Sequence, residues 1–201
     1  MPGVTPQCSR ATTSQPLSRQ PAAFLDRDGT LITDAHYLSR PDQLRLIPGV
    51  SRAIRTLNDA GVPVVVVTNQ SGIARGYFTP EEYCEVERAL DEMLRDAGAV
   101  LAGSYHCPHL PEISGPCECR KPGVALFRLA AQEHGLALDR SLYVGDRWRD
   151  VSPALVLGGT GVLVPASSTP SAERDRATAH SMVAPSLAAA VESFLREPSQ
   201  G

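Results

Sequence analysis

The sequence predicts an α/β fold, a Rossmann-like three-layer sandwich with a central parallel sheet, and two observations lead to this prediction. Residues 64–67 are four consecutive valines. Such a β-branched run is typical of a strand buried on both faces, as in a parallel sheet. Short apolar runs also alternate with segments of helical periodicity along the chain. This alternation indicates a βαβ series with right-handed crossovers.

The expected elements follow the apolar runs and the helix start and stop signals. Strands are predicted over residues 22–26, 63–69, 101–106, 141–146 and 161–164. Helices are predicted over residues 48–61, 79–97, 124–134, 151–157 and 185–195. The helix at 79–97 begins with the capping box Thr79-Pro80-Glu81-Glu82. Residues 165–179 are expected to form a polar connection.

Length and composition indicate one domain of ordinary size. The chain has 201 residues, of which 42% are hydrophobic, and a net charge of −3. We expect a single domain over residues 21–197, preceded by a disordered tail over residues 1–20 that is rich in Ser, Thr, Pro and Gln. The acidic balance argues against nucleic acid as a partner. No apolar run suits a signal peptide or a membrane span, so we expect a cytoplasmic protein.

Three of the predicted strands end in a residue that can take part in chemistry: Asp26, Thr68 and Asp146. The carboxyl ends of parallel strands share one edge of an open sheet, where α/β proteins bind ligands. These residues are therefore expected in one cleft. Asp26 and Asp28 would point in opposite directions in extended backbone, so that one can attack a substrate while the other approaches its leaving group.

A calcium loop does not explain these carboxylates. An EF-hand needs Gly at its sixth position and Glu at its twelfth. Counted from Asp26, these positions hold Leu31 and Tyr37. A plain solvated turn remains an alternative interpretation of this stretch taken alone.

Four short motifs follow one another along the chain. They are Asp26-Arg27-Asp28-Gly29-Thr30-Leu31, Thr68-Asn69-Gln70-Ser71-Gly72-Ile73, Arg120-Lys121-Pro122 and Gly145-Asp146-Arg147-Trp148-Arg149-Asp150. Each is a weak signal alone, because strand exits and a Lys before Pro are common. In this order, over residues 22–164, the set resembles the four motifs of haloacid dehalogenase-like (HAD-like) phosphatases.

This resemblance implies a HAD-like fold and phosphoryl transfer. By the resemblance, Asp26 is the nucleophile and forms an aspartyl-phosphate, and Asp28 is the general acid and base. Thr68 is a catalytic residue that hydrogen-bonds a phosphoryl oxygen. Lys121 stabilises the charge on the nucleophile and on the phosphoryl group.

The resemblance also implies a catalytic Mg²⁺, which prefers hard oxygen ligands. The ligands by resemblance are the carboxylates of Asp26 and Asp146 and the backbone carbonyl of Asp28. Asp150 is expected to hold the loop that carries Asp146.

A second metal is indicated by the cysteines. The chain has five, an odd number, and three of them lie close to a histidine in the set Cys107, His109, Cys117 and Cys119. Three thiolates and one imidazole fill the four positions of a structural zinc site. The alternative is a chance cluster of free cysteines with a solvated histidine. We expect a zinc loop over residues 107–120 that fixes the approach of Arg120 and Lys121 to the cleft.

The short loop after Thr30 leaves no room for a cap domain. A capless phosphatase with a zinc loop resembles the D-glycero-D-manno-heptose 1,7-bisphosphate 7-phosphatases of heptose biosynthesis, and their histidinol-phosphate phosphatase relatives. The usual Asp-His-Gly-Tyr pattern of the heptose enzymes is matched at Asp34 and Tyr37 but not at Ala35 and His36. The substrate-binding residues implied by this resemblance are Asp34, Tyr37, Thr68, Asn69, Gln70, Ser71, Arg120, Lys121 and Arg147.

The leading interpretation is a monomeric magnesium-dependent phosphatase acting on a small phosphorylated sugar, and three alternatives stay open. Histidinol phosphate is cationic and would require acidic partners, whereas Arg120 and Arg147 suit a second anion. A polynucleotide 3′-phosphatase is disfavoured by the acidic pI of about 5.9. A non-catalytic zinc-bearing binding module is disfavoured by the complete set of Asp26, Asp28, Lys121 and Asp146.

Overall fold

The centre of the computed structural model, which describes residues 19–34, 37–180 and 182–196, is a parallel sheet. In the described part of the chain the sheet has five strands in the order β3-β2-β1-β4-β5. The strands are β1 (Ala23–Leu25), β2 (Val64–Asn69), β3 (Gly103–Cys107), β4 (Leu142–Gly145) and β5 (Thr160–Leu163). The predicted parallel sheet is confirmed, and its strands start or end within two residues of the predicted limits.

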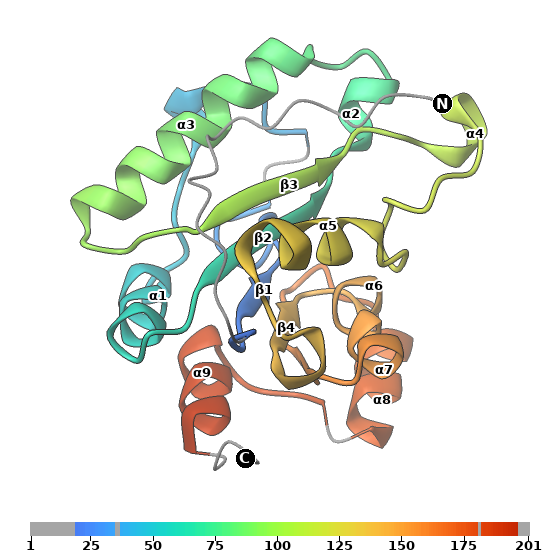
Figure 1. Ribbon diagram of the computed structural model, residues 1–201. Coiled ribbons are helices and arrows are strands. Elements are labelled where there is room, and N and C mark those ends of the chain that lie inside the picture. Colours follow the sequence, from blue (N-terminus) through green and yellow to red (C-terminus); the bar gives the residue numbers. More distant parts are fainter. Residues whose placement is uncertain (1–18, 35–36, 181, 197–201) are drawn as a thin grey trace.

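Helices cover both faces of the sheet, so the predicted three layers are confirmed (Figure 1). One face is covered by α1 (Val50–Asp59), α3 (Pro80–Asp96) and α9 (Leu187–Arg196). The other is covered by α5 (Ala125–His134), α6 (Trp148–Val151), α7 (Pro153–Leu157) and α8 (Ser171–Ala179). The shorter helices are α2 (Ser71–Ala74), α4 (Pro111–Ser114), η1 (Pro41–Gln43) and η2 (Leu138–Arg140).

Alternate residues of β1, β2 and β4 pack into two separate cores, one on each face of the sheet. In β2, Val64 and Val66 pack with α1, α3 and α9, whereas Val65 and Val67 pack on the opposite face with α5. Each of the four valines is at most 1% exposed. Burial on both faces explains why this strand reads as a continuous apolar run rather than as an alternation.

The prediction for residues 165–179 was wrong. Residues 171–179 form the helix α8, of which Ala177 is the buried residue. A helix with so little apolar surface lacks the periodic signal on which the prediction relied. Its polar side chains instead make specific contacts, described below.

The boundaries of two other predicted segments also differ from the structure. The predicted helix at 151–157 is two helices, because Pro153 begins a new turn after α6. Gln20, expected in the disordered tail, pairs with Leu136 through hydrogen bonds to Gly135 and Ala137. Arg19, also in the predicted tail, accepts a hydrogen bond at its carbonyl from Nη2 of Arg140 at 2.7 Å. Residues 1–18 lie outside the described residues.

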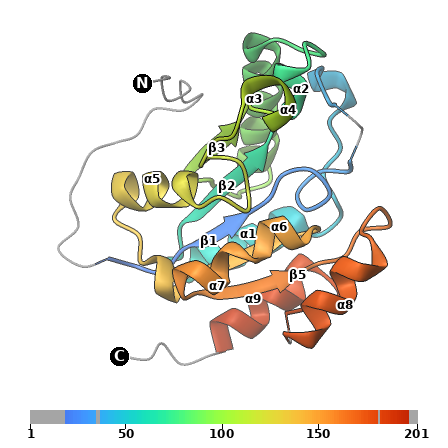
Figure 2. The same cartoon turned by 90° about the vertical axis from the view of Figure 1, so that its right-hand side faces the viewer.

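All strands point their carboxyl ends toward the same edge of the sheet, as the arrowheads of β1 and β5 indicate in Figure 2. The loops that follow β1, β2 and β4 therefore meet there. Among the described residues, no helix combines the length and apolar character that a membrane crossing requires.

Candidate active site

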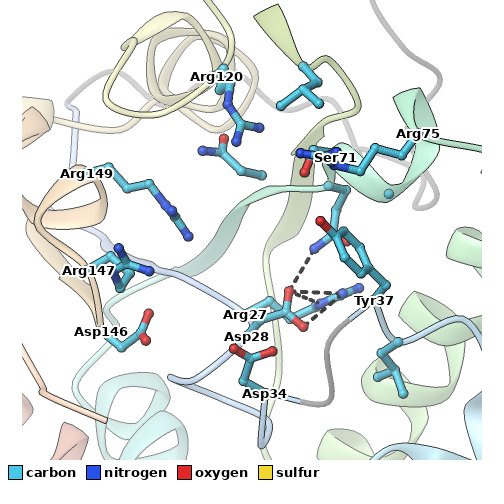
Figure 3. Close-up of a pocket in the computed structure, with 15 residues that line it drawn as sticks. Arg27, Asp28, Asp34, Tyr37, Ser71, Arg75, Arg120, Asp146, Arg147 and Arg149 are labelled. Carbon is cyan, nitrogen blue, oxygen red and sulfur yellow. Dashed lines mark hydrogen bonds and ion pairs between the residues drawn. The ribbon is translucent and has the colours of Figure 1, made fainter. Parts of the chain in front are cut away.

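A pocket of about 380 Å³ opens at this edge of the sheet (Figure 3). It is lined by Arg27, Asp28, Asp34, Tyr37, Leu38, Asn69, Gln70, Ser71, Gly72, Arg75, Leu110, Arg120, Asp146, Arg147 and Arg149. Nine of the predicted site residues are in this lining. Of the others, Asp26, Thr68 and Lys121 are buried, between 1% and 5% exposed.

Asp26 follows β1, and its backbone N–H donates to the carbonyl of Val144 in the neighbouring strand. Its Oδ1 lies 2.6 Å from Nζ of Lys121. Burial raises the pKa of Asp26 to about 6, although the charge of Lys121 opposes this. Asp26 and Lys121, which were predicted to act together, are thus in contact in the structure.

Lys121 joins three parts of the site. Besides Asp26, its Nζ contacts Oδ1 of Asp150 at 2.8 Å and donates to the carbonyl of Val67 at 2.5 Å. Burial would lower the pKa of Lys121, but Asp150 and Asp26 together raise it. The side chain of Asn69 fixes the lysine backbone through two hydrogen bonds, of 2.9 and 3.1 Å. Asn69, which was predicted to bind substrate, therefore also positions Lys121.

Three carboxylates form a group that fits a magnesium ion. Oxygen atoms of Asp26, Asp146 and Asp150 lie within 4.8 Å of one another. Burial, and then the charges of Asp26 and Asp150, raise the pKa of Asp146 to about 7. A divalent cation bound by oxygen ligands would relieve this repulsion. Asp150 also accepts a hydrogen bond from the backbone N–H of Arg147, as expected of a residue that holds this loop. The Asp28 carbonyl as a ligand stays a prediction.

Gly29 allows the close approach of the first and fourth motifs. A Cβ at this position would lie 2.8 Å from Oδ2 of Asp146. The backbone of Gly29 also has a φ of +81°, in the left-handed region that glycine adopts without strain.

The carboxylate of Asp28 is held by neighbouring donors. Nε and Nη2 of Arg27 each donate to it over 3.1 Å, and Nε2 of Gln70 donates over 2.8 Å. The same Gln70 nitrogen lies 2.9 Å from the hydroxyl of Thr68. Gln70, expected to bind substrate, therefore also connects the first and second motifs.

Arginines surround the pocket on several sides. In Figure 3, Arg147 and Arg149 lie on one side and Arg75 on the other, with Arg120 between them. Arg120 and Arg147 were predicted, whereas Arg75 and Arg149 were missed. Arg149 lies inside the fourth motif and Arg75 lies two residues after the second. Their positions next to the motifs could have predicted that they line the pocket.

Helix α8 supports the fourth motif. Glu173 pairs with the guanidinium of Arg147 at 2.7 Å and accepts a hydrogen bond from the backbone N–H of Trp148 at 2.6 Å. Thr169, just before this helix, donates to the carbonyl of Asp146 at 2.7 Å. Sequence reasoning missed both residues, because the segment was expected to be a connection.

In Figure 3, Tyr37 lies across the pocket from Arg147, and Asp34 lies near Asp28. Asp34 and Tyr37 both line the pocket, whereas Ala35 and His36 lie outside the described residues. Tyr37 has a φ of +63° and packs edge-on against Tyr77, with ring centres 4.6 Å apart.

The four predicted zinc ligands come together beside the pocket. Donor atoms of Cys107, His109, Cys117 and Cys119 lie within 4.8 Å of one another. The closest pairs are Cys107 Sγ to Cys119 Sγ at 3.1 Å and His109 Nδ1 to Cys119 Sγ at 3.2 Å. This donor set fits a closed, tetrahedral structural zinc site. Arg120 follows directly, and its Nη1 donates to the carbonyl of His109 at 3.1 Å.

Comparison with known proteins identifies the family. Residues 23–104 match the model of haloacid dehalogenase-like hydrolases, and residues 118–190 match a second HAD-hydrolase-like model. A D-glycero-beta-D-manno-heptose-1,7-bisphosphate 7-phosphatase of Haemophilus ducreyi is 41% identical over 161 residues, which are 77% of this chain and 88% of that protein. The protein of the same name from Yersinia pestis is 42% identical over 78% of this chain and 87% of its own length.

The chain belongs to this family of HAD-like phosphatases.

Solved structures of the family agree with the fold described above. A D,D-heptose 1,7-bisphosphate phosphatase from B. bronchiseptica, complexed with magnesium and phosphate, superimposes with a TM-score of 0.76. It is 31% identical, and the match covers 89% of this chain and 99% of that one. A HAD-like phosphatase from Mesorhizobium loti gives a TM-score of 0.72 at 34% identity, covering 94% of each chain. Magnesium bound to a family member is consistent with the three clustered carboxylates of Asp26, Asp146 and Asp150.

Proposed function

We propose that the chain is a magnesium-dependent phosphomonoesterase that removes the 7-phosphate of D-glycero-D-manno-heptose 1,7-bisphosphate. The observation that carries the phosphatase chemistry is the buried contact between Asp26 and Lys121, beside the carboxylates of Asp146 and Asp150. The names of relatives at about 40% identity support the sugar. The roles of individual residues below are part of this proposal.

In the first step, a carboxylate oxygen of Asp26 attacks the phosphorus of the 7-phosphate. A bond forms between this oxygen and phosphorus, and the bond from phosphorus to the sugar oxygen breaks. Asp28 gives its proton to that sugar oxygen, which leaves as a hydroxyl. Lys121 and the hydroxyl of Thr68 stabilise the negative charge on the transferred group.

In the second step, water attacks the phosphorus of the aspartyl-phosphate. Asp28, now ionised, takes a proton from the water, and the bond between phosphorus and Asp26 breaks. Inorganic phosphate leaves, Asp26 is again a carboxylate and Asp28 is again protonated. Buried donors such as Lys121 need no reorganisation between the two steps.

A magnesium ion, when bound, neutralises the charge between the phosphate and the carboxylates. The residues that would hold it are Asp26 and Asp146 through their carboxylates and Asp28 through its backbone carbonyl. Asp150 belongs to the same group of carboxylates but is engaged by Lys121 and by the backbone of Arg147.

The arginines suit the phosphate that stays on the sugar. Arg120 and Arg147 line the pocket together with Arg75 and Arg149. A guanidinium binds phosphate through two parallel hydrogen bonds, so arginine is well matched to a bisphosphate. Histidinol phosphate carries a cationic amine instead, which these side chains would repel.

We also propose that the enzyme works as a monomer in a reducing compartment such as the cytoplasm. The thiols of Cys107, Cys117 and Cys119 are free, as zinc binding requires.

The proposal is tested by measuring phosphate release with Mg²⁺. We expect kcat/KM for one anomer of heptose 1,7-bisphosphate to exceed that for histidinol phosphate by about 100-fold or more, equivalent to about 2.7 kcal/mol. A preference for histidinol phosphate would overturn the assignment of the sugar but keep the chemistry.

The variant Asp26→Asn tests the nucleophile. It should fold normally and lose turnover, because an amide cannot form the aspartyl-phosphate. Asp42→Asn is a matched control, since the Asp42 side chain is 63% exposed and pairs with Arg40 outside the pocket lining. Normal turnover in Asp26→Asn would exclude Asp26 as the nucleophile.

A further inference from the structure

A buried chain of ion pairs connects helix α3 with Asp28. The guanidinium of Arg27, which is 1% exposed, donates to both carboxylate oxygens of Asp28 over 3.1 Å each. Its Nη1 donates over 2.8 Å to Oε1 of Glu87, a residue of α3 that is itself buried. Figure 3 shows Arg27 and Asp28 joined at one side of the pocket.

Further contacts fix the inner end of this chain. The second carboxylate oxygen of Glu87 accepts a hydrogen bond from the hydroxyl of Ser104 in β3. The ring of Tyr83 lies 5.2 Å from the guanidinium carbon of Arg27. Burial alone would lower the pKa of Arg27, but the carboxylates of Asp28 and Glu87 raise it above its ordinary value. The guanidinium is therefore charged and held on two sides.

Glu87 has no task in the chemistry described so far. Burying two charges costs solvation energy, and well-packed apolar residues often stabilise a fold at least as well as a buried ion pair. Stability is therefore a weak reason for this arrangement. Asp28, in contrast, needs a defined orientation, because a general acid must lie within hydrogen-bond distance of the oxygen that it protonates.

The hydrogen bonds of Arg27 connect the orientation of the Asp28 carboxylate to Glu87. The planar fork of Arg27 meets both oxygens of Asp28, which fixes the plane of the carboxylate. Nη1, the remaining terminal nitrogen of Arg27, is taken by Glu87. Without Glu87 the guanidinium could turn toward other acceptors, and the Asp28 carboxylate would then be held by Gln70 through one oxygen only.

We propose that Glu87 is a positioning residue for the proton transfer by Asp28, and that it acts through Arg27. The inference rests on the proposed function, because it assumes that Asp28 protonates the leaving oxygen. A residue of α3 that lies outside all four motifs would then contribute to the rate of the first step.

Leaving groups of different acidity provide the test. A sugar oxygen must be protonated as it leaves, whereas p-nitrophenolate leaves readily without a proton. The kcat/KM of both substrates reports on the first step only, so the general-base role in the second step does not interfere. We expect Glu87→Gln and Glu87→Ala to lower kcat/KM for heptose 1,7-bisphosphate by about 10- to 100-fold, which is no more than the lower end of the about 100- to 10,000-fold that a general acid contributes. The value for p-nitrophenyl phosphate should change less than about threefold.

Two reference variants define the scale. Asp28→Asn should lose activity on the sugar phosphate selectively and set the upper limit of the effect. Ser141→Ala removes a buried hydroxyl that binds Ala22 and Ala137 at the opposite end of the sheet. It should lower stability without changing the ratio of the two substrates.

Each outcome has a defined meaning. A selective loss on the sugar phosphate, smaller in Glu87→Gln than in Glu87→Ala, supports the positioning role. An equal loss on both substrates, or no loss, overturns it in favour of a structural role. If Glu87→Ala does not fold, the ratio measured for Glu87→Gln decides alone. Failure of the proposed function is distinguishable, since the unmodified enzyme would then release no phosphate from the sugar.

Discussion

At the scale of single residues, the site depends on how one lysine balances several carboxylates. Lys121 is 3% exposed and contacts both Asp26 and Asp150, while Asp146 lies in the same group. Buried carboxylates without a counter-charge are costly, so we expect the lysine to be needed for folding as well as for the proposed catalysis.

Replacing this lysine by a neutral side chain of similar size should therefore affect both properties. We expect Lys121→Met to lower the free energy of unfolding at pH 8 without metal by about 3 kcal/mol or more. Turnover should fall by about 100-fold or more, because a donor to the transferring group is lost. Urea denaturation and phosphate release measure the two effects.

Arg40→Met serves as the control for the loss of an ion pair. Arg40 pairs with Asp42, but both side chains are more than 60% exposed, so little change in stability is expected. Equal unfolding midpoints for Lys121→Met and the unmodified protein would contradict the role given to Lys121.

The motifs predict the residues at the centre of the site but not those that hold them in place. Asp26, Asp146 and Lys121 were identified from short motifs and meet in the structure as expected. Glu87 was missed because nothing in the acidic helix α3 distinguishes the carboxylate that folds inward from those exposed to solvent. Its burial depends on Arg27, which lies 60 residues away in the sequence.

At the scale of elements, local signals decide what can be predicted. The capping box of α3 is present in the structure, with Thr79 and Glu82 each bonding the other's backbone. Helix α8 has neither an apolar face nor a side-chain cap. Its contacts include the buried Ala177, the ion pair of Glu173 with Arg147, and Arg176 over the ring of Trp148. Only the folded chain brings this helix to the fourth motif.

The zinc loop is the element whose removal should have the broadest effect. Cys117→Ser, or chelation of zinc, should lower stability and turnover together, because the loop ends at Arg120 and Lys121. Metal analysis of the purified protein should find about one zinc per chain. Ser114→Ala alters the same loop without removing a ligand and should leave both properties nearly unchanged.

Protein purified without zinc but with full activity would contradict this account of the loop. So would a Cys117→Ser variant whose turnover and thermal midpoint match those of the unmodified protein.

At the scale of the whole molecule, the sheet edge concentrates negative charge that the metal-free protein must tolerate. The pKa of Asp146 is raised by burial to about 7 and that of Asp26 to about 6, from an ordinary value of 3.8. Because the pKa of these carboxylates is higher in the folded protein than in the unfolded chain, their ionisation favours the unfolded chain. Stability of the metal-free protein should therefore fall as pH rises from about 4 to about 7.

Magnesium should reverse this loss, since it binds the ionised carboxylates. We expect the rise in Tm on adding Mg²⁺ to be larger at pH 8 than at pH 5.5, where protons compete for the same oxygens. Asp146→Asn should reduce the rise at pH 8. Thermal unfolding with and without Mg²⁺ measures this, and an equal rise at both pH values would contradict the proposed site.

The central claim is that the pocket holds one phosphate of the sugar at Asp26 while its arginines keep the other. Phosphorus NMR of the reaction with heptose 1,7-bisphosphate tests this most directly, because it identifies the phosphate that is lost. We expect the resonance of the 7-phosphate to disappear as inorganic phosphate forms, while the 1-phosphate remains on the sugar. Loss of the 1-phosphate, or loss of both at similar rates, would contradict it.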